Sequence, residues 1–311
     1  MANRPLVKTL LAFSIVYFVW GSTFLAIRVG VHEVPPLLFA ALRFTAAGVL
    51  LYGWTRVRGE RAPSRREWMS VVLMALLIFV FDYGPLFWAE TRVDSGVTAV
   101  MMATIPVFMA IGDVALLRTR RFTLGLGAAL LVGLAGVAVL TLRSGAMGGA
   151  AISGAGAAAL VFAAMSWAVA SVLTRRLPLP ESKMVSSGAQ MLVGGVMLGI
   201  VAGALGEFPR FHPAAVSSGA WVSLAYLIVA GSIVGFTAYL WLIHHESPTH
   251  VGTYAYVNPV VAVAIGHWFG GEALGLRTLV GTALILASVV AIMATRAGQR
   301  VGETASEKGN A

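Results

Sequence analysis

Ten long apolar runs occupy most of this 311-residue chain. They cover residues 8–28, 36–54, 68–88, 96–117, 124–142, 152–174, 184–204, 219–241, 250–270 and 276–296. The hydrocarbon core of a bilayer requires about 20 predominantly apolar residues in helical form, and these runs have about that length. The sequence therefore predicts an all-α polytopic membrane protein with ten transmembrane helices.

The composition excludes a soluble globular domain. Hydrophobic residues make up 58% of the chain and charged residues 11%, more apolar surface than one soluble core could bury. The first run follows Arg4 and Lys8, as in a signal peptide, but it is longer than a signal peptide's apolar region and lacks a cleavage site, so we interpret it as a retained helix. Cysteine is absent, which excludes disulfides and thiolate metal sites. The sequence therefore does not indicate whether the protein works in an oxidising or a reducing compartment.

The positive charge predicts the orientation. With a cytoplasmic N-terminus, 16 Lys and Arg residues fall in inner segments and five in outer segments, while Arg43 lies inside a run. Cytoplasmic loops are the ones enriched in Lys and Arg, so both termini should be cytoplasmic. The arginines are scattered singly and in pairs between apolar runs, which does not favour nucleic-acid binding. Residues 297–311 are polar, and we expect them to form a disordered cytoplasmic tail.

An internal repeat divides the chain into residues 1–147 and 148–296. Residues recur in the same order at an offset that steps from 147 to 153 to 154. The matched pairs are Trp20 with Trp167, Arg43 with Gln190, Gly48 with Gly195, Trp88 with Trp241, Pro106 with Pro259, and Gly127 with Gly281. Each unit has five helices, an odd number, so the second copy must be inverted in the membrane. Inverted repeats are a recurrent design of secondary transporters, whose sites lie near the midplane between the repeats.

Two prolines interrupt corresponding helices of this repeat. Pro106 lies in "VMMATIPVFMAIG" and Pro259 in "TYAYVNPVVAVAIG". Proline cannot donate a backbone hydrogen bond, so the carbonyls of Met102 and Ala255 are released. Three roles remain open: these carbonyls bind a ligand, the weakened turns act as hinges, or the kinks only shape packing.

Several segments together resemble the EamA-like family of the drug/metabolite transporter superfamily. They are "VYFVWGSTFLAIRVGVHEVPPLLFAALRFTAAGVLL", "SWAVASVLTRR" and "YAYVNPVVAVAIGHWFGGEALGLRTLVGTALI". Within that family the chain is most similar to bacterial exporters of amino acids and related metabolites. The resemblance implies ten helices in two inverted halves, a central cavity lined by the first four helices of each half, and a fifth helix set aside. One departure is visible: the second half has Gly271-Glu272 after its proline helix, and the first half has Arg118-Thr119 there.

Two charged residues, Arg43 and Asp82, lie well inside apolar runs, away from the ends of those runs. Charges inside a membrane are costly, which makes Arg43 and Asp82 functional candidates. Counted along their helices they reach similar depth, so we predict an ion pair, which would be either a static tie between helices or part of a substrate or proton site. A buried carboxylate can carry a proton, so Asp82 is also the candidate for proton coupling. Asp113 and Arg118 fit a salt bridge at the cytoplasmic end.

Aromatic and polar side chains on the predicted cavity helices are candidates for substrate recognition. Aromatic faces bind apolar or cationic groups, and hydroxyls and amides orient polar ones. With Arg43 and Asp82, the candidates are Trp20, Ser22, Thr23, Tyr83, Met101, Trp167, Tyr254, Tyr256 and Asn258. Trp68, Trp88, Trp221 and Trp241 fall at helix ends and are typical of the membrane interface. Gly195, Gly199 and Gly203 are spaced for close helix packing.

Other classes of protein fit the same residues less well. No Walker motif is present, which excludes ATP-driven pumping by this chain. "HHESPTH" at 244–250 lacks the spacing of a zinc site, and we interpret it as a cytoplasmic turn. An intramembrane aspartyl protease would need Asp82 and Asp113 in contact, yet their depths differ by about 15 Å. A passive channel stays open, since selectivity filters need not show a motif.

The sequence thus predicts a secondary transporter of the bacterial inner membrane that works by alternating access. We expect it to export amino acids or similar small amphipathic metabolites, and not to be an enzyme. We expect no cofactor, no metal ion and no nucleic acid among its partners; its partners are a small-molecule substrate and membrane lipid, and a homodimer is compatible with this pattern.

The topology can be tested by labelling. Because Lys and Arg favour the inside, labels at Ser64 and in the C-terminal tail should react only from the cytoplasm, and labels at Ser144 or Ala214 only from the periplasm. A periplasmic Ser64 would contradict the inverted repeat.

Overall fold

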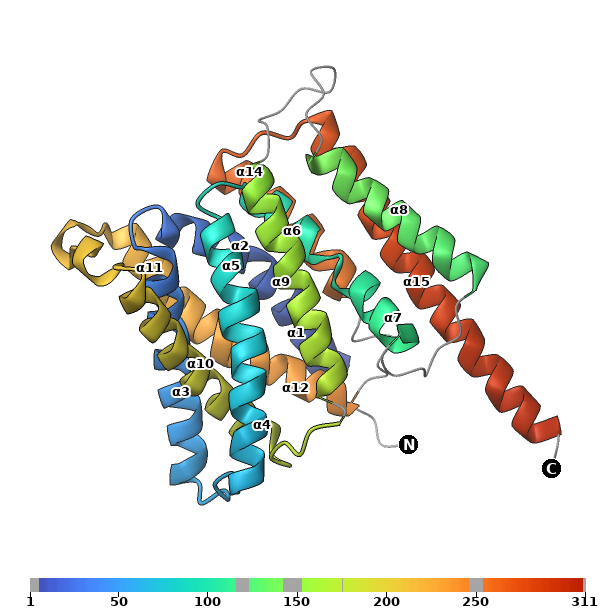
Figure 1. The fold of residues 1–311 in the computed structure, drawn as a ribbon, viewed down its shortest axis with the longest axis horizontal. Coiled ribbons are helices and arrows are strands. Elements are labelled where there is room, and N and C mark those ends of the chain that lie inside the picture. Colours follow the sequence, from blue (N-terminus) through green and yellow to red (C-terminus); the bar gives the residue numbers. More distant parts are fainter. Residues whose placement is uncertain (1–5, 116–122, 142–152, 175, 246–253, 310–311) are drawn as a thin grey trace.

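The chain folds into one bundle of helices in the computed structural model, which describes residues 6–115, 123–141, 153–174, 176–245 and 254–309 (Figure 1). The described residues contain no β-strand. The predicted all-α polytopic class is therefore confirmed.

Each apolar run corresponds to one helix or to several consecutive helical segments. The first half consists of α1 (Leu6–Ser14), η1 (Ile15–Val19), α2 (Trp20–Val31), α3 (Pro36–Val57), α4 (Arg65–Ala75), η2 (Leu76–Tyr83), α5 (Gly84–Ala89), α6 (Ser95–Met102), α7 (Ile105–Ala115) and α8 (Leu124–Thr141). The second half consists of α9 (Gly154–Leu173), α10 (Lys183–Ala204), the short η3 (Phe208–Arg210) and η4 (Pro213–Ala215), α11 (Ser218–Tyr226), η5 (Leu227–Val234), α12 (Gly235–His245), α14 (Tyr254–Gly270) and α15 (Leu276–Gly309).

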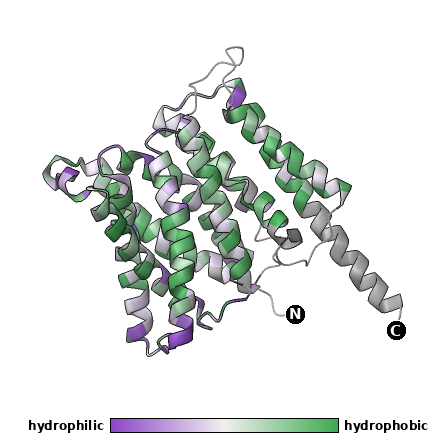
Figure 2. Cartoon of the chain, in the orientation of Figure 1, coloured by the Kyte–Doolittle hydropathy of each residue, from purple (hydrophilic) through white to green (hydrophobic). Residues whose placement is uncertain are grey.

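Six helices in the described part of the chain are long and apolar enough to cross a membrane. They span Val7–Val31, Pro36–Val57, Arg65–Ala89, Gly154–Leu173, Lys183–Ala204 and Ser218–Tyr239. Four shorter apolar helices, Ser95–Met109, Leu124–Leu140, Val257–Gly270 and Leu276–Ile292, are the fourth and fifth of each half. Figure 2 shows apolar residues along the helices and hydrophilic residues toward their ends.

Helix starts follow local capping rules. The Ser64 hydroxyl accepts from the Glu67 backbone N–H at 3.4 Å, and the Glu67 carboxylate accepts from the Ser64 N–H at 2.5 Å, which completes a capping box for α4. Ser153, Ser182 and Ser217 cap α9, α10 and α11 in the same way, each with a hydroxyl that accepts a backbone N–H. These serines bond backbone donors that the helix itself leaves unpaired.

The helices α3 and α10 pack closely against each other through glycines. A Cβ added at Gly48 would lie 2.3 Å from the backbone nitrogen of Leu192, and one at Gly195 would lie 2.4 Å from that of Thr45. Residues 45 and 48 of the first half match 192 and 195 of the second at the offset of 147. The two contacts are therefore reciprocal, as a local twofold relation between the two helices requires. The inversion of the complete halves stays a prediction.

The fifth helices of the halves form a separate pair. α8 and α15 lie side by side at one edge of the bundle (Figure 1). The Ser288 hydroxyl on α15 donates to the Ala129 carbonyl on α8 at 2.7 Å, and a Cβ at Gly136 would lie 2.7 Å from the Ile285 side chain. Small residues thus permit this close contact.

Three helices contain segments with π geometry, in which hydrogen bonds run from residue i to i+5. The segments η2 and η5 each have eight residues and lie in the third helix of their halves, while η1 interrupts the first helix. π segments are frequent at functional sites, because the insertion turns side chains and leaves carbonyls without their helical donors. Nothing in the hydropathy pattern predicted them.

Two local predictions concern segments that the structure describes only in part. Residues 297–309 continue α15 as a helix, which projects beyond the bundle in Figure 1, whereas we predicted a disordered tail; residues 310–311 lie outside the described residues. Most residues of this stretch are helix formers, and they extend a helix that is already nucleated. His244 and His245 end α12 instead of forming a turn, and the rest of "HHESPTH" lies outside the described residues.

The α3–α10 contact predicts a steep dependence of stability on the size of residue 48. Gly48→Ala should lower the apparent melting temperature of the purified protein, because overpacking a close contact costs about 1–3 kcal/mol. Gly53→Ala on the same helix is the control, since a Cβ there meets no atom within 4 Å. Its melting temperature should stay the same or rise, because alanine favours a helix over glycine. Equal melting temperatures for the two variants would contradict this account of the contact.

Candidate functional site

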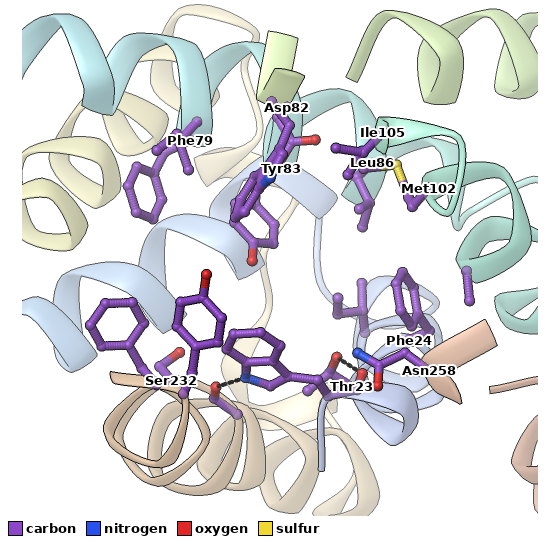
Figure 3. A pocket seen from close by; sticks show the side chains of 18 of the residues that line it. Thr23, Phe24, Phe79, Asp82, Tyr83, Leu86, Met102, Ile105, Ser232 and Asn258 are labelled. Atoms are coloured by element: carbon purple, nitrogen blue, oxygen red, sulfur yellow. Dashed lines mark hydrogen bonds between the residues drawn. The ribbon is translucent and has the colours of Figure 1, made fainter. Parts of the chain in front are cut away.

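A cavity of about 290 Å³ lies inside the bundle. Its wall comes from α2, α3, η2, α5, α6, α7, α9, α10, η5, α12 and α14, so both halves contribute. Figure 3 shows Phe79, Asp82 and Tyr83 on one side of the space and Thr23, Ser232 and Asn258 on the other. The volume is near the lower end of the usual range for small-molecule sites, about 300–1,000 Å³.

Most of the predicted site residues line this cavity. They are Trp20, Thr23, Arg43, Asp82, Tyr83, Pro106, Trp167, Tyr254, Asn258 and Pro259. Ser22 and Met101 do not: the Ser22 hydroxyl lies 2.6 Å from the Tyr226 hydroxyl, and Met101 is a buried core residue. These two face other helices rather than the cavity. The side chain of Tyr256 lies outside the described residues.

The π segments supply carbonyl acceptors along the cavity wall. The Trp20 Nε1–H donates to the Gly231 carbonyl in η5 at 3.1 Å, and the Ser232 hydroxyl donates to the Leu227 carbonyl at 3.0 Å. In the other half, the Ser166 hydroxyl on α9 donates to the Leu77 carbonyl in η2 at 2.8 Å. Side chains of the first helix in each half therefore bond the irregular backbone of a third helix.

The two prolines have different surroundings. α6 ends at Met102 and α7 begins at Ile105, so the fourth helix of the first half is broken just before Pro106. The Thr104 hydroxyl donates to the Met101 carbonyl at 2.7 Å inside this break. Pro259, in contrast, lies within the single helix α14, where the Asn258 Oδ1 is buried and has no hydrogen-bond partner. Among the described residues, only the first of these helices is seen to be divided; residues 246–253, just before α14, lie outside them.

Arg43 and Asp82 both lie in the cavity wall, but the predicted ion pair between them is wrong. No Arg43 nitrogen lies within 4.0 Å of an Asp82 oxygen. The Arg43 Nε–H donates to the Ser232 hydroxyl at 3.3 Å, and the Asp82 Oδ1 is buried without a partner. The count of residues along each helix gave depth only, whereas the direction of the side chain depends on helical phase. Asp82 lies in the π segment η2, which changes that phase.

A second group of charges closes one end of the bundle. Arg28, at the end of α2, pairs with Asp94 at 2.7 Å and with Glu272 at 3.5 Å. The Glu272 carboxylate also accepts the backbone N–H groups of Ser95 and Gly96, at 2.7 and 3.0 Å. It thus caps α6 from the loop between α14 and α15. We call Arg28, Asp94, Ser95, Gly96 and Glu272 the latch; none of them lines the cavity.

The backbones are also close at the latch. A Cβ at Gly96 would lie 3.0 Å from the Val263 Cα, and one at Gly266 would lie 2.4 Å from a Glu272 carboxylate oxygen. The helices α6 and α14 therefore meet with no room for larger side chains. Burial raises the pKa of the Asp94 carboxyl, against the opposing charge of Arg28.

Glu90 lies next to the latch and is fully buried, and both of its carboxylate oxygens lack a hydrogen-bond partner. The Arg28 guanidinium approaches its backbone carbonyl at 3.5 Å. Hydropathy gives no reason to select Glu90 from the sequence, because it lies between the apolar runs 68–88 and 96–117. The only available signal was its position two residues after Trp88, at the end of the first of these runs.

Two further carboxylates cap helices from the adjacent loops. Glu33 accepts the Ser217 N–H and hydroxyl at 2.6 Å each, and these bonds lower the pKa of its carboxyl. Glu207 accepts the Leu38 N–H at 2.8 Å, although burial raises the pKa of its carboxyl. Glu33, Glu207 and Glu272 thus start α11, α3 and α6, respectively. The predicted outer loops are tied together by these bonds.

The sequence analysis missed most of the apolar wall. Phe24, Phe44, Phe79, Phe236 and Tyr239 line the cavity. A phenylalanine inside an apolar run carries no signal that separates a cavity wall from a lipid-facing surface. Among the described residues, no group of three or more His, Cys, Asp or Glu could hold a metal ion.

Comparisons with known proteins give matches over almost the entire chain. The model of the EamA-like transporter family matches residues 7–142 and again residues 154–294. YedA, an inner membrane transporter of Escherichia coli (strain K12), is 35% identical over 296 residues, which cover 94% of this chain and 92% of YedA. The transporter YoaV of Bacillus subtilis (strain 168) is 26% identical, over 91% of this chain and 96% of YoaV.

A solved crystal structure has the same fold. It superposes with a TM-score of 0.61 and 24% sequence identity, over 95% of this chain and 98% of the other. At this identity the likeness supports the fold alone.

Proposed function

This chain belongs to the EamA-like transporter family and is a multi-pass transporter of the inner membrane, and from that premise we propose that it exports amino acids or similar small amphipathic metabolites by alternating access. Export is the direction that the resemblance of the sequence to bacterial exporters implies. The alternative is a passive channel or facilitator with the same cavity.

The observation that carries this proposal is the chemistry of the cavity wall. The wall is mostly apolar and includes nine aromatic residues, and the buried side chains of Arg43 and Asp82 are not paired with each other. An apolar wall with a few fixed polar groups is typical of small-molecule sites. A molecule with an apolar part and one or two charged groups is complementary to such a wall.

The predicted site residues have definite tasks in this proposal. The rings of Trp20, Trp167 and Tyr254 contact the apolar part, and Thr23 and Asn258 orient polar groups. Trp20 packs against Tyr239 and Tyr254, with ring centroids 5.2 and 5.6 Å apart, which holds its indole in place. Such edge and tilted contacts are favourable arrangements for aromatic pairs.

Alternating access requires the latch to open. The ion pairs of Arg28 and the cap on α6 join α2, α6 and the loop after α14 at one end of the cavity. In the proposed cycle these contacts break, α6 moves away from α14, and the break before Pro106 and the turn before Pro259 serve as hinges. Hinges of transporters are typically a few residues that absorb large dihedral changes.

Transport assays test the function. In proteoliposomes loaded with an unlabelled amino acid, the protein should drive saturable counterflow of the labelled compound, with a panel of amino acids tested with and without a pH gradient. A carrier shows counterflow because substrate must bind before each conformational change. Uptake that neither saturates nor shows counterflow would favour the channel.

The latch predicts a change in accessibility. In an Ala99→Cys variant, the thiol lies on α6 in the cavity wall, and the chain has no other cysteine. Adding Glu272→Gln should raise its labelling rate by an impermeant reagent outside intact cells several-fold, because the charged cap on α6 and the pair with Arg28 are both weakened.

The matched control is Glu33→Gln in the same Ala99→Cys background. Glu33 also caps a helix at this end, but it does not contact α6. Its labelling rate should equal that of the parent. If both variants react at the parental rate, the latch does not control access at this end.

A further inference from the structure

The guanidinium of Arg43 is buried in the cavity wall without an acidic partner. The residue is 4% exposed, and its Nη1 has no hydrogen-bond partner. Its Nε–H donates to the neutral Ser232 hydroxyl at 3.3 Å, and no carboxylate oxygen in the described part of the chain lies within 4.0 Å of its nitrogens. One donor edge of this cation is therefore left unused by the protein.

Aromatic rings surround the guanidinium, while the buried carboxyl of Glu90 acts on it only at a distance and forms no ion pair with it. The guanidinium carbon lies 4.7 Å from the centroid of the Phe44 ring, 5.6 Å from that of Tyr83 and 6.0 Å from that of Phe87. Ring faces attract a cation but are poor substitutes for a charged hydrogen-bond acceptor. They hold Arg43 in position without satisfying its Nη1.

The irregular backbone of η5 fixes the orientation of the guanidinium. The Ser232 hydroxyl donates a hydrogen bond to the Leu227 carbonyl. Its oxygen can therefore accept a hydrogen bond from the Arg43 Nε–H. A Cβ at Gly231 would lie 3.3 Å from the Arg43 Nη2, so glycine leaves space for the group. Ser232 is thus a positioning residue that directs the Nη edge.

We infer that Arg43 binds the carboxylate of the transported substrate; this rests on the proposed function. Arginine keeps its charge inside proteins, and a buried charge without an anion is costly. A carboxylate supplies the missing charge and two acceptor oxygens that match the planar donors of the guanidinium. The free energy of this contact would be available only when substrate is bound.

The surroundings favour a monoanion over a phosphate. Among the described residues, Arg43 is the only lysine or arginine in the cavity wall, and the carboxyl group of Asp82 lies in the same wall. A dianionic phosphate would thus meet a single cation for its two negative charges. The aromatic wall suits an apolar group attached to the carboxylate. The substrate class is therefore a small monocarboxylate with an apolar side chain, which includes the proposed amino acids.

Matched pairs of ligands that differ only in charge test this inference. Binding to the purified protein would be measured by calorimetry for acetate and acetamide, benzoate and benzamide, 3-phenylpropionate and 3-phenylpropanamide, and N-acetyl-leucine and its amide. At least one carboxylate should bind about tenfold or more tightly than its amide, as expected for a charge-assisted hydrogen bond. If no carboxylate binds more tightly than its amide, the inference is wrong.

Variants test whether the preference for a carboxylate over its amide depends on Arg43. Arg43→Gln should remove the preference for the carboxylate, and Arg43→Lys should retain part of it, since lysine keeps the charge but lacks the planar pair of donors. Ser232→Ala should reduce the preference without removing it. The control is Arg92→Gln, which removes an exposed positive charge outside the cavity and should leave the preference unchanged. If Arg43→Gln does not fold, Arg43→Lys and Ser232→Ala still decide the question.

The outcomes separate this inference from the proposed function. A carboxylate preference that depends on Arg43, without counterflow of any amino acid in proteoliposomes, would leave the binding site standing and reject the transport proposal. If amino acids show counterflow and Arg43→Gln keeps the wild-type preference for carboxylates, the transport proposal stands and the inference about Arg43 is rejected.

Discussion

Backbone hydrogen bonding in the absence of water is the constraint on which this structure depends. A helix satisfies its own N–H and C=O groups except at its ends and at irregular turns, and lipid offers no partners there. This chain meets the requirement with side chains. Trp20 and Ser166 donate to carbonyls of the π segments, and Glu33, Glu207 and Glu272 accept from N–H groups at helix starts. The same bonds that satisfy the backbone also position the cavity wall and the latch.

Apolar length was sufficient to predict the class of fold and the location of the helices, because membrane insertion depends on length and hydropathy. The repeat was sufficient to bring Trp20, Trp167, Pro106 and Pro259 to one cavity. The direction in which a side chain points around its helix axis could not be predicted from the apolar length or from the repeat. A π segment rotates the residues that follow it, so Asp82 and Arg43 have similar predicted depth but do not pair. Glu90 shows a second limit of prediction from hydropathy. The end of an apolar run does not fix the end of the helix, so the burial of a residue just beyond the run could not be predicted.

The charges of this protein fall into two groups with different environments. In the latch, Arg28 is shared between Asp94 and Glu272, and the Glu272 carboxylate also accepts two backbone N–H groups. In the cavity, Arg43 directly contacts rings and a hydroxyl, with the carboxyl of Glu90 acting on it only at a distance, and Asp82 has an oxygen without a partner. Paired charges favour one arrangement of helices, whereas unpaired charges favour a ligand. In the proposed transport cycle, the first group would serve the conformational change and the second would serve substrate binding.

The position of Glu272 has a consequence for the sidedness of transport. At the offset of 153 residues, Thr119 stands in the first half where Glu272 stands in the second, so the carboxylate of this cap has no counterpart by sequence. Contacts that stabilise closure at one end alone make the two conformers unequal in free energy and in population. The half-saturation concentration measured from one face of the membrane would then differ from that at the other face. Net accumulation of an uncoupled substrate would still be zero, because unequal populations change the kinetics of a carrier and not its equilibrium.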